Sequence, residues 1–156
     1  MRSIFIGRSV LAVMTLGLAV GTVMAQDWPA YRGPEGTGVA RQSPKLARTW
    51  PAEGPKQLWR ADLGPGFGGA AIAGGKVYLL DRVGETGDKL RVFDLDTGVE
   101  DWSIAYDAPG KTGYHGSRST PAVDSGRVYA IGPFGQLYCL DIATQKTLWQ
   151  LSLPGD

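Results

Sequence analysis

A dense group of carboxylates lies in the segment FDLDTGVEDW, residues 93–102. Asp94 and Asp96 stand two residues apart, and acidic side chains follow at Glu100 and Asp101. Alternating carboxylates followed by a glycine are typical of the start of a calcium-binding loop, in which side-chain oxygens coordinate the ion. The first question is therefore whether this segment binds a metal and does chemistry, or serves the fold.

The spacing of the later positions argues against calcium. A calcium loop of the helix–loop–helix type needs oxygen ligands at positions 5 and 12 and glycine at position 6. Counted from Asp94, those positions hold Gly98, Ala105 and Val99, respectively. The pattern fails at three places, and we expect no metal site here. A site confined to this one segment is the alternative.

A second copy of the segment shows which residues the chain needs. LRVFDLDTGVEDW, residues 90–102, aligns with LYCLDIATQKTLW, residues 137–149. Most of the acids are absent from the second copy. Three identities recur at a separation of 47 residues, namely Asp94 with Asp141, Thr97 with Thr144, and Trp102 with Trp149.

These shared residues suit a structural role better than a chemical one. An aspartate at the start of a turn accepts backbone N–H groups, and a threonine hydroxyl ties into the same turn. Gly98 can adopt a left-handed backbone without steric cost, a conformation that costs Gln145 about 1 kcal/mol. The tryptophan ring then buries a large area against a neighbouring sheet. The segment is therefore predicted to be a clamp between sheets.

The elements that carry these copies have the periodicity of β-strands. KVYLL, KLRVFDL, RVYAI and QLYCLDI are short, rich in β-branched and aromatic residues, and bounded by turn residues. Gly74-Gly75 and Ser125-Gly126 suit tight hairpin turns with positive φ. AIAGGKVYLL and AVDSGRVYAI align at a separation of 51 residues, and a further strand containing Trp59 is expected around residues 58–63.

Four short strands repeated at this interval predict an all-β fold, a β-propeller with about two four-stranded blades present. The blades are expected at about residues 57–106 and 107–156. Propellers close with about 4–8 blades, so we expect the N-terminal part of a longer protein. The alternatives are a two-blade protein that oligomerises and an incomplete product with no independent activity.

The N-terminus has the features of a secretory signal peptide over residues 1–25. It begins with positive charge, continues with an apolar stretch over residues 10–23, and has small residues at Val23 and Ala25. An uncleaved membrane anchor is the alternative. We expect export to the periplasm or cell envelope, no membrane span after cleavage, and an N-terminal extension over residues 26–56. Cys139, the only cysteine, is expected in a buried strand rather than in a disulfide.

The repeated segment resembles the tryptophan-docking motif Ala-x-Asp-x-x-Thr-Gly-x-x-x-Trp of pyrroloquinoline quinone (PQQ)-type β-propellers. Residues 92–102 match it with valine for alanine, and residues 139–149 match it with cysteine for alanine and glutamine for glycine. WPAYRGPEGTGV, residues 28–39, and SRSTPAVDSGRVYAIG, residues 117–132, resemble exported bacterial PQQ-like repeat proteins. The resemblance covers essentially the whole chain after the signal peptide and implies the quinoprotein type of propeller.

The resemblance implies two classes of function. The family includes quinoprotein alcohol dehydrogenases, which hold PQQ and calcium on the propeller axis, and the propeller lipoprotein of outer-membrane protein assembly, which binds partner proteins. The dehydrogenases often stack the quinone on adjacent cysteines, whereas this chain has one cysteine. The leading hypothesis is a binding or scaffold module. The alternative is a PQQ-dependent alcohol or sugar dehydrogenase, with PQQ and calcium bound by the full-length protein.

The best candidate surface for a ligand is KTGYHGSRST, residues 111–120, which precedes a predicted innermost strand. Tyr114, His115, Arg118 and Ser119 are the predicted ligand-binding residues, since Arg grips carboxylates and His titrates near neutrality. A protein or small-molecule ligand at the propeller funnel is expected. The alternative is that these side chains only hold loop carbonyls. No catalytic residue is assigned, and a net charge of +1 indicates no nucleic acid partner.

Overall fold

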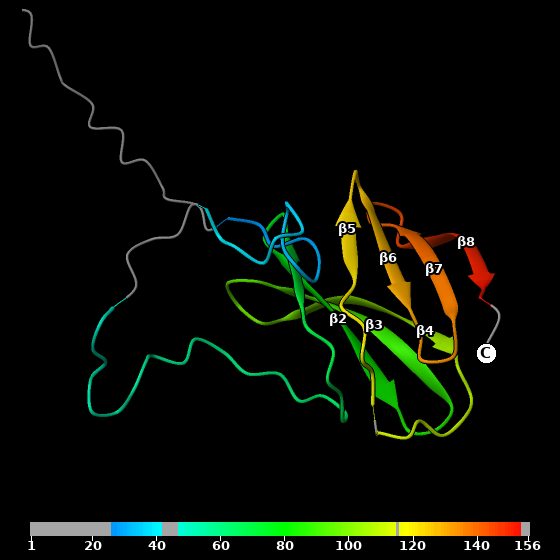
Figure 1. Ribbon diagram of the computed structural model, residues 1–156, viewed down its shortest axis with the longest axis horizontal. Helices are drawn as coiled ribbons and strands as arrows, with labels where there is room; N and C mark the ends of the chain where they lie inside the picture. Colours follow the sequence, from blue (N-terminus) through cyan, green and yellow to red (C-terminus); the bar gives the residue numbers. More distant parts are fainter. Residues whose placement is uncertain (1–25, 42–46, 115, 154–156) are drawn as a thin grey trace, which may run out of the picture.

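The computed structural model describes residues 26–41, 47–114 and 116–153 (Figure 1). The predicted signal peptide and His115 lie outside these residues. The described chain is all-β, without a helix, and forms two four-stranded antiparallel sheets. The strands of the first sheet are β1 (Ala71–Ala73), β2 (Lys76–Val83), β3 (Gly87–Asp94) and β4 (Glu100–Asp107). Those of the second are β5 (Ala122–Asp124), β6 (Arg127–Ile131), β7 (Gln136–Asp141) and β8 (Lys146–Ser152).

Each sheet follows the chain order, so every strand pairs with the next through a hairpin. The turns between the first two strands of each sheet have positive φ, as predicted. Gly74 and Gly75 have φ of 57° and 72°, and Ser125 and Gly126 have φ of 48° and 75°. Two positive φ values in a two-residue turn match the right-handed twist of the flanking strands. These residues therefore determine where the first and second strands of each sheet join.

The two sheets are irregular at equivalent places. The register between β3 and β4 shifts between Val92 and Phe93, and that between β7 and β8 shifts between Cys139 and Leu140. An extra residue in one strand bends it and increases its twist. Cys139 is fully buried in β7, as predicted. The sequence repeat is therefore also a repeat of backbone irregularities.

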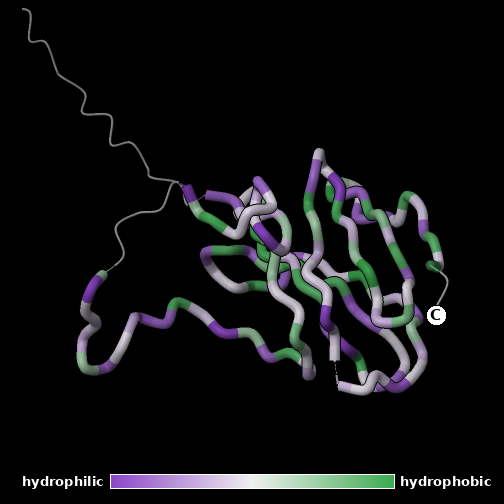
Figure 2. Tube along the Cα trace, viewed as in Figure 1, coloured by the Kyte–Doolittle hydropathy of each residue, from purple (hydrophilic) through white to green (hydrophobic). Residues whose placement is uncertain are grey.

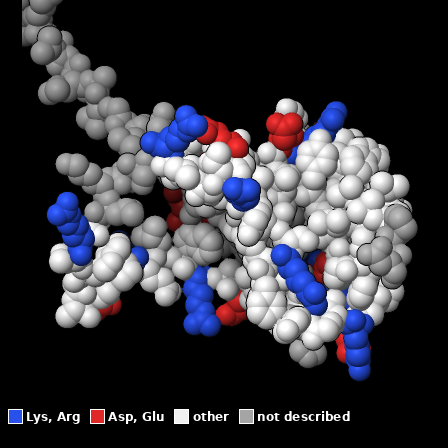
Figure 3. Space-filling model, viewed as in Figure 1, with Lys and Arg blue, Asp and Glu red and all other residues white. Residues whose placement is uncertain are grey.

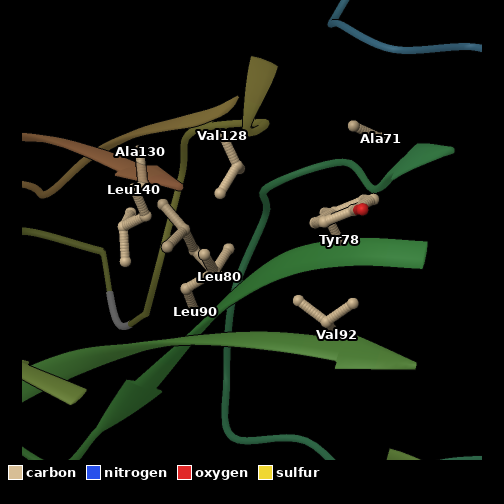
Figure 4. Close-up of a cluster of buried hydrophobic side chains, with 8 residues drawn as sticks. All are labelled: Ala71, Tyr78, Leu80, Leu90, Val92, Val128, Ala130 and Leu140. Carbon is tan, nitrogen blue, oxygen red and sulfur yellow. The ribbon is translucent and has the colours of Figure 1, made fainter. Parts of the chain in front are cut away.

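The core lies between the sheets, and hydrophobic residues run along the strands of both (Figure 2). Leu80 and Leu90 of the first sheet approach Val128, Ala130 and Leu140 of the second (Figure 4). The Tyr106 and Tyr138 rings meet with their centroids 4.3 Å apart. Such an arrangement of repeated four-stranded sheets is a partial β-propeller.

One expected element is absent. Residues 58–63 were predicted to form a strand, but no strand includes them. A strand requires a ladder of backbone hydrogen bonds with a neighbouring strand, and residues 58–63 pair with no strand of either sheet. The segment instead contacts the first sheet through side chains, including the Trp59 ring. Across the described residues, no helix is long and apolar enough to cross a membrane.

Candidate functional site

The loops that precede β1 and β5 lie side by side. Gly66 and Ser117 form a parallel β-bridge, and the Ser117 carbonyl accepts the N–H groups of Phe67 at 2.6 Å and Gly68 at 3.0 Å. Gly66 and Ser117 are equivalent positions, 51 residues apart in the two repeats. Matching loops of successive repeats therefore pair with each other at this end of the sheets.

The glycines of the first loop make this close approach possible. A Cβ atom on Gly68 would lie 2.5 Å from the Ser119 carbonyl oxygen, and one on Gly69 would lie 2.8 Å from Oγ1 of Thr120. The Gly69 N–H donates to the same Oγ1 at 3.1 Å. Any side chain at these positions would force the loops apart. The glycines at positions 68 and 69 therefore allow the two loops to lie in backbone contact.

Three exposed side chains gather on the paired loops. Phe67 and Tyr114 meet edge to face with ring centroids 6.3 Å apart, and Arg118 lies 5.7 Å from the Tyr114 centroid. Phe67 is 71% exposed and Tyr114 is 72% exposed. A cleft of about 320 Å³ opens between the three. We call Phe67, Tyr114 and Arg118 the loop cluster.

Arg118 brings an unneutralised charge to the loop cluster. Its Nη2 donates to the Tyr114 carbonyl at 3.2 Å. Within the described ranges, no carboxylate forms an ion pair with it, whereas nearby Lys111 pairs with Glu85 at 3.7 Å. Elsewhere acidic and basic side chains are interspersed on the surface in view (Figure 3). The cluster therefore combines two aromatic rings with a cation that can pair with an anionic group.

The predicted ligand residues have different places. Tyr114 and Arg118 come together in the loop cluster. Ser119 contributes its carbonyl to the contact with Gly68, while His115 lies outside the described residues. Phe67 was missed because its loop has no polar side chain. The 51-residue repeat was the available signal, since it aligns Phe67 with Arg118.

A buried polar network anchors the second loop to the first sheet. Asp88 Oδ1 accepts Nη1 of Arg82 at 3.3 Å and the Ser117 hydroxyl at 3.2 Å. Arg82 Nη2 donates to the Gly110 carbonyl at 2.9 Å. The Arg82 and Asp88 side chains are 3% and 0% exposed. Two of the anchors, Gly110 and Ser117, flank Tyr114, so the network positions the loop that carries it.

Two buried oxygens have no hydrogen-bond partner among the described residues, namely Oδ2 of Asp88 in the network and the hydroxyl of Tyr106. Burial, followed by the charge of Asp88, raises the pKa of Tyr106. Tyr106 is therefore a neutral phenol at physiological pH, able to donate a hydrogen bond.

The first acidic segment forms a closed turn. Asp94 Oδ1 accepts the Thr97 hydroxyl at 2.9 Å and the backbone N–H groups of Thr97 at 3.0 Å and Asp96 at 3.2 Å. The Thr97 hydroxyl, then its N–H and Lys76, lower the pKa of Asp94. Gly98 has φ of 70°. The Asp94 carboxylate therefore stabilises this turn.

The second segment repeats this geometry. Asp141 Oδ1 accepts the Thr144 N–H at 2.7 Å and its hydroxyl at 2.6 Å, and these bonds lower the pKa of Asp141. Gln145 occupies the position of Gly98 with φ of 57°, so the left-handed backbone persists without glycine.

Two further acids of the opening segment, Glu100 and Asp101, are paired with cations. Asp101 lies 3.0 Å from Lys76 Nζ, and Glu100 pairs with Arg91, which lowers the Glu100 pKa. In the part of the chain that is described, no three His, Cys, Asp or Glu residues are grouped to hold a metal ion.

The three tryptophans of the repeats differ in burial. Trp102 is half-buried and meets Tyr78 edge to face at 6.5 Å. Trp149 lies 6.2 Å from Tyr129 but is 44% exposed. Trp59 stacks on Phe93 at 6.4 Å. Each ring therefore lies against one of the two sheets.

Solved structures resemble this chain in part. The crystal structure of BamB from Moraxella catarrhalis is 25% identical, with a TM-score of 0.44, and the match covers 56% of this chain and 24% of that one. A europium-containing methanol dehydrogenase is 18% identical, with a TM-score of 0.42, and the match covers 58% of this chain and 16% of that one. The aligned parts are thus a quarter or less of either protein.

No curated protein matches the chain. A family model described as outer membrane protein assembly factor BamB matches residues 27–156. The all-β fold of two repeated four-stranded sheets agrees with that match. The chain therefore belongs to this family of PQQ-repeat β-propellers.

Proposed function

We propose that the protein is an exported binding or scaffold module of the periplasm or cell envelope. Residues 1–25 are the signal peptide, 26–56 an N-terminal extension, and 57–106 and 107–156 two blades of a longer propeller. Membership of the family described as an outer membrane protein assembly factor supports this location. The ligand-binding surface is the loop cluster.

The exposure of the loop cluster is the observation that carries the proposal. Phe67 and Tyr114 each expose more than two thirds of their surface, next to Arg118 without a carboxylate partner in the described chain. Aromatic and arginine side chains dominate the energetics of protein interfaces. The loops beneath are fixed by backbone hydrogen bonds to Ser117 and by the Arg82–Asp88 pair. Such preorganisation reduces the entropy lost on binding.

The uncovered face of the second sheet supports a further blade. Tyr129, Cys139 and Trp149 are in register across β6, β7 and β8. The equivalent row of the first sheet, Tyr78, Val92 and Trp102, packs in the core against the second sheet. Trp149 and Leu151 are instead 44% and 54% exposed. A third blade packs on this face, and the tryptophans clamp successive blades together.

Site-specific photocrosslinking in the native cells tests the proposed surface. Benzoylphenylalanine replaces Phe67 or Tyr114 in the full-length protein, and Tyr31, an equally exposed aromatic residue outside the loop cluster, is the control position. We expect a discrete protein adduct from positions 67 and 114 but not from 31, and its loss on Arg118→Ala. Equal or absent crosslinking at all three positions would contradict the proposal.

A titration distinguishes the dehydrogenase alternative. The purified full-length protein is titrated with PQQ in the presence of calcium, and dye-linked oxidation of alcohols and sugars is followed. A binding module is expected to show neither saturable PQQ binding nor turnover. Saturable binding with turnover would replace the proposal by a quinoprotein dehydrogenase.

A further inference from the structure

The N-terminal extension pairs with the first strands of both sheets. Trp28 and Ile72 exchange backbone hydrogen bonds, with Trp28 N–H donating to the Ile72 carbonyl at 2.8 Å and Ile72 N–H returning at 2.9 Å. The next carbonyl, that of Pro29, accepts the Val123 N–H of β5 at 2.8 Å. Asp27 Oδ2 accepts the Gly74 N–H at 3.1 Å. One short extended segment thus joins two sheets.

The edges that it joins face the propeller axis. β1 and β5 each have one sheet neighbour, so each has a second edge with unpaired backbone groups. The two sheets also approach each other at these strands. Blades of a propeller surround a central channel, which their converging strands line. Residues 27–30 therefore lie on the channel side of both blades, beside β5 in the picture (Figure 1).

Two residues of the extension, Pro29 and Gly33, suit its pairing with both β1 and β5. Because the backbone groups of successive residues in an extended segment point to opposite sides, Trp28 bonds with β1 whereas the carbonyl of Pro29 points to β5. Proline has no N–H, so this residue only accepts a hydrogen bond on the β5 side. Gly33 then folds back over the indole of Trp28, where a Cβ atom would lie 2.9 Å from three ring atoms. Its φ of 75° also favours glycine. Tyr31 between them is 79% exposed and takes no part in the packing.

We propose that the free edges of β1 and β5 form a binding site for an extended polypeptide, occupied by residues 27–30 of this chain. Exposed strand edges recognise extended peptides through backbone hydrogen bonds, and a side-chain anchor adds specificity. In this proposal Trp28, which pairs with Ile72 through its backbone and packs its indole under Gly33, is that anchor. The segment is a resident ligand, so an extended segment of a partner protein gains access to the edges only by displacing it.

The position of this site separates it from the loop cluster. Asp27 reaches the β1–β2 turn at Gly74, whereas the loop cluster precedes β1 and β5 at the opposite end of the strands. The extension therefore contacts the turn end of the inner edges, whereas the loops at the other end pair with each other. The inference does not depend on the proposed function of the loop cluster.

A peptide added in trans tests the site. In the full chain, residues 27–33 are replaced by a glycine–serine linker, and a fluorescent peptide of residues 26–39 is titrated in. We expect saturable binding to this variant and at least about tenfold weaker binding to the unmodified chain, whose site is filled. Trp28→Ala in the peptide should weaken binding by about tenfold or more, and Tyr31→Ala should leave it unchanged. Equal binding of the peptide to both proteins, or of the Trp28→Ala and unmodified peptides, would overturn the proposal.

Hydrogen exchange on the intact full chain tests the occupancy without removing the segment. We expect slow exchange of the Ile72 and Val123 amides, which Gly33→Ala accelerates by about tenfold or more. Gly36→Ala is the matched control, because Gly36 also has positive φ, at 65°, but no neighbour within 4 Å. Exchange of both amides at the rate of exposed amides in the unmodified chain would refute the occupancy, as would identical effects of the two substitutions.

Discussion

The indole of Trp59 packs directly on the backbone of Gly98. A Cβ atom on Gly98 would lie 2.4 Å from Cδ2 of the ring, and the indole Nε1 donates to the Leu95 carbonyl at 2.8 Å. Gly98 therefore meets two requirements, since it also has φ of 70°. The turn between β3 and β4 therefore packs against the ring of Trp59, which comes from the segment before β1.

Gly98→Ala should destabilise the chain by at least about 2 kcal/mol, because left-handed strain is added to the displacement of the Trp59 ring. Gly74→Ala provides the control, since Gly74 has φ of 57° and no neighbour within 4 Å. Its cost should be about 1 kcal/mol, from strain alone. Urea denaturation followed by tryptophan fluorescence measures both. Equal costs would show that contact with Trp59 does not constrain position 98.

Trp102→Ala should lower the free energy of unfolding by about 3–5 kcal/mol, because the ring packs against the core between the sheets. Trp149→Ala should cost about 1 kcal/mol in the 26–156 chain, since the ring is 44% exposed there. Chemical denaturation of the two variants gives the comparison. A Trp102→Ala cost below about 1 kcal/mol would place that ring on the surface.

Thr97→Val should raise the pKa of Asp94, because the Thr97 hydroxyl is the main cause of its lowered value. A carboxyl with a lower pKa in the folded state stabilises the fold above its unfolded pKa of about 3.9, and this contribution is lost as the pH falls through the folded pKa. The variant should therefore lose less stability on acidification below about pH 4.

Carboxyl ¹³C NMR of Asp94 and acid unfolding measure both effects of the Thr97 substitution. Thr97→Ser keeps the hydroxyl and should leave the pKa of Asp94 lowered. An unchanged pKa in Thr97→Val would show that the threonine hydroxyl is not what holds the carboxylate.

Asp88→Asn should destabilise the chain by about 3 kcal/mol, because it leaves the buried Arg82 guanidinium without its anionic partner. Glu85→Gln, in the exposed pair with Lys111, should cost less than about 1 kcal/mol. Thermal unfolding ranks the two variants. Faster hydrogen exchange at residues 110–118 is expected in Asp88→Asn alone. Equal exchange in Asp88→Asn and Glu85→Gln would show that the network does not anchor this loop.

Much of the fold could be predicted because its signals are local. The turns at Gly74-Gly75 and Ser125-Gly126 depend on the φ preferences of their own residues, and the strands depend on short β-rich stretches between turn residues. Burial of Cys139 follows from its place within an apolar strand. The repeat itself revealed the family, since its spacing is visible by comparing the chain with itself.

The candidate site could be predicted only in part. Tyr114 and Arg118 could be predicted because they stand close together in one polar loop. Phe67 was not, because its role arises from the pairing of its loop with another loop 51 residues later. The Arg82–Asp88–Ser117 network was hidden for the same reason, since three separate segments contribute to it.

The sequence by itself determined the strand pattern, the turns and the identity of the repeat, because neighbouring residues decide φ, ψ and side-chain alternation. Tertiary structure decided that residues 58–63 contact a sheet without forming a strand, and that the acids near Asp94 pair with Lys76 and Arg91. It also placed the extension on the inner edges of β1 and β5. These outcomes depend on which distant backbone groups and charges come within reach, and this is set by how the two sheets pack.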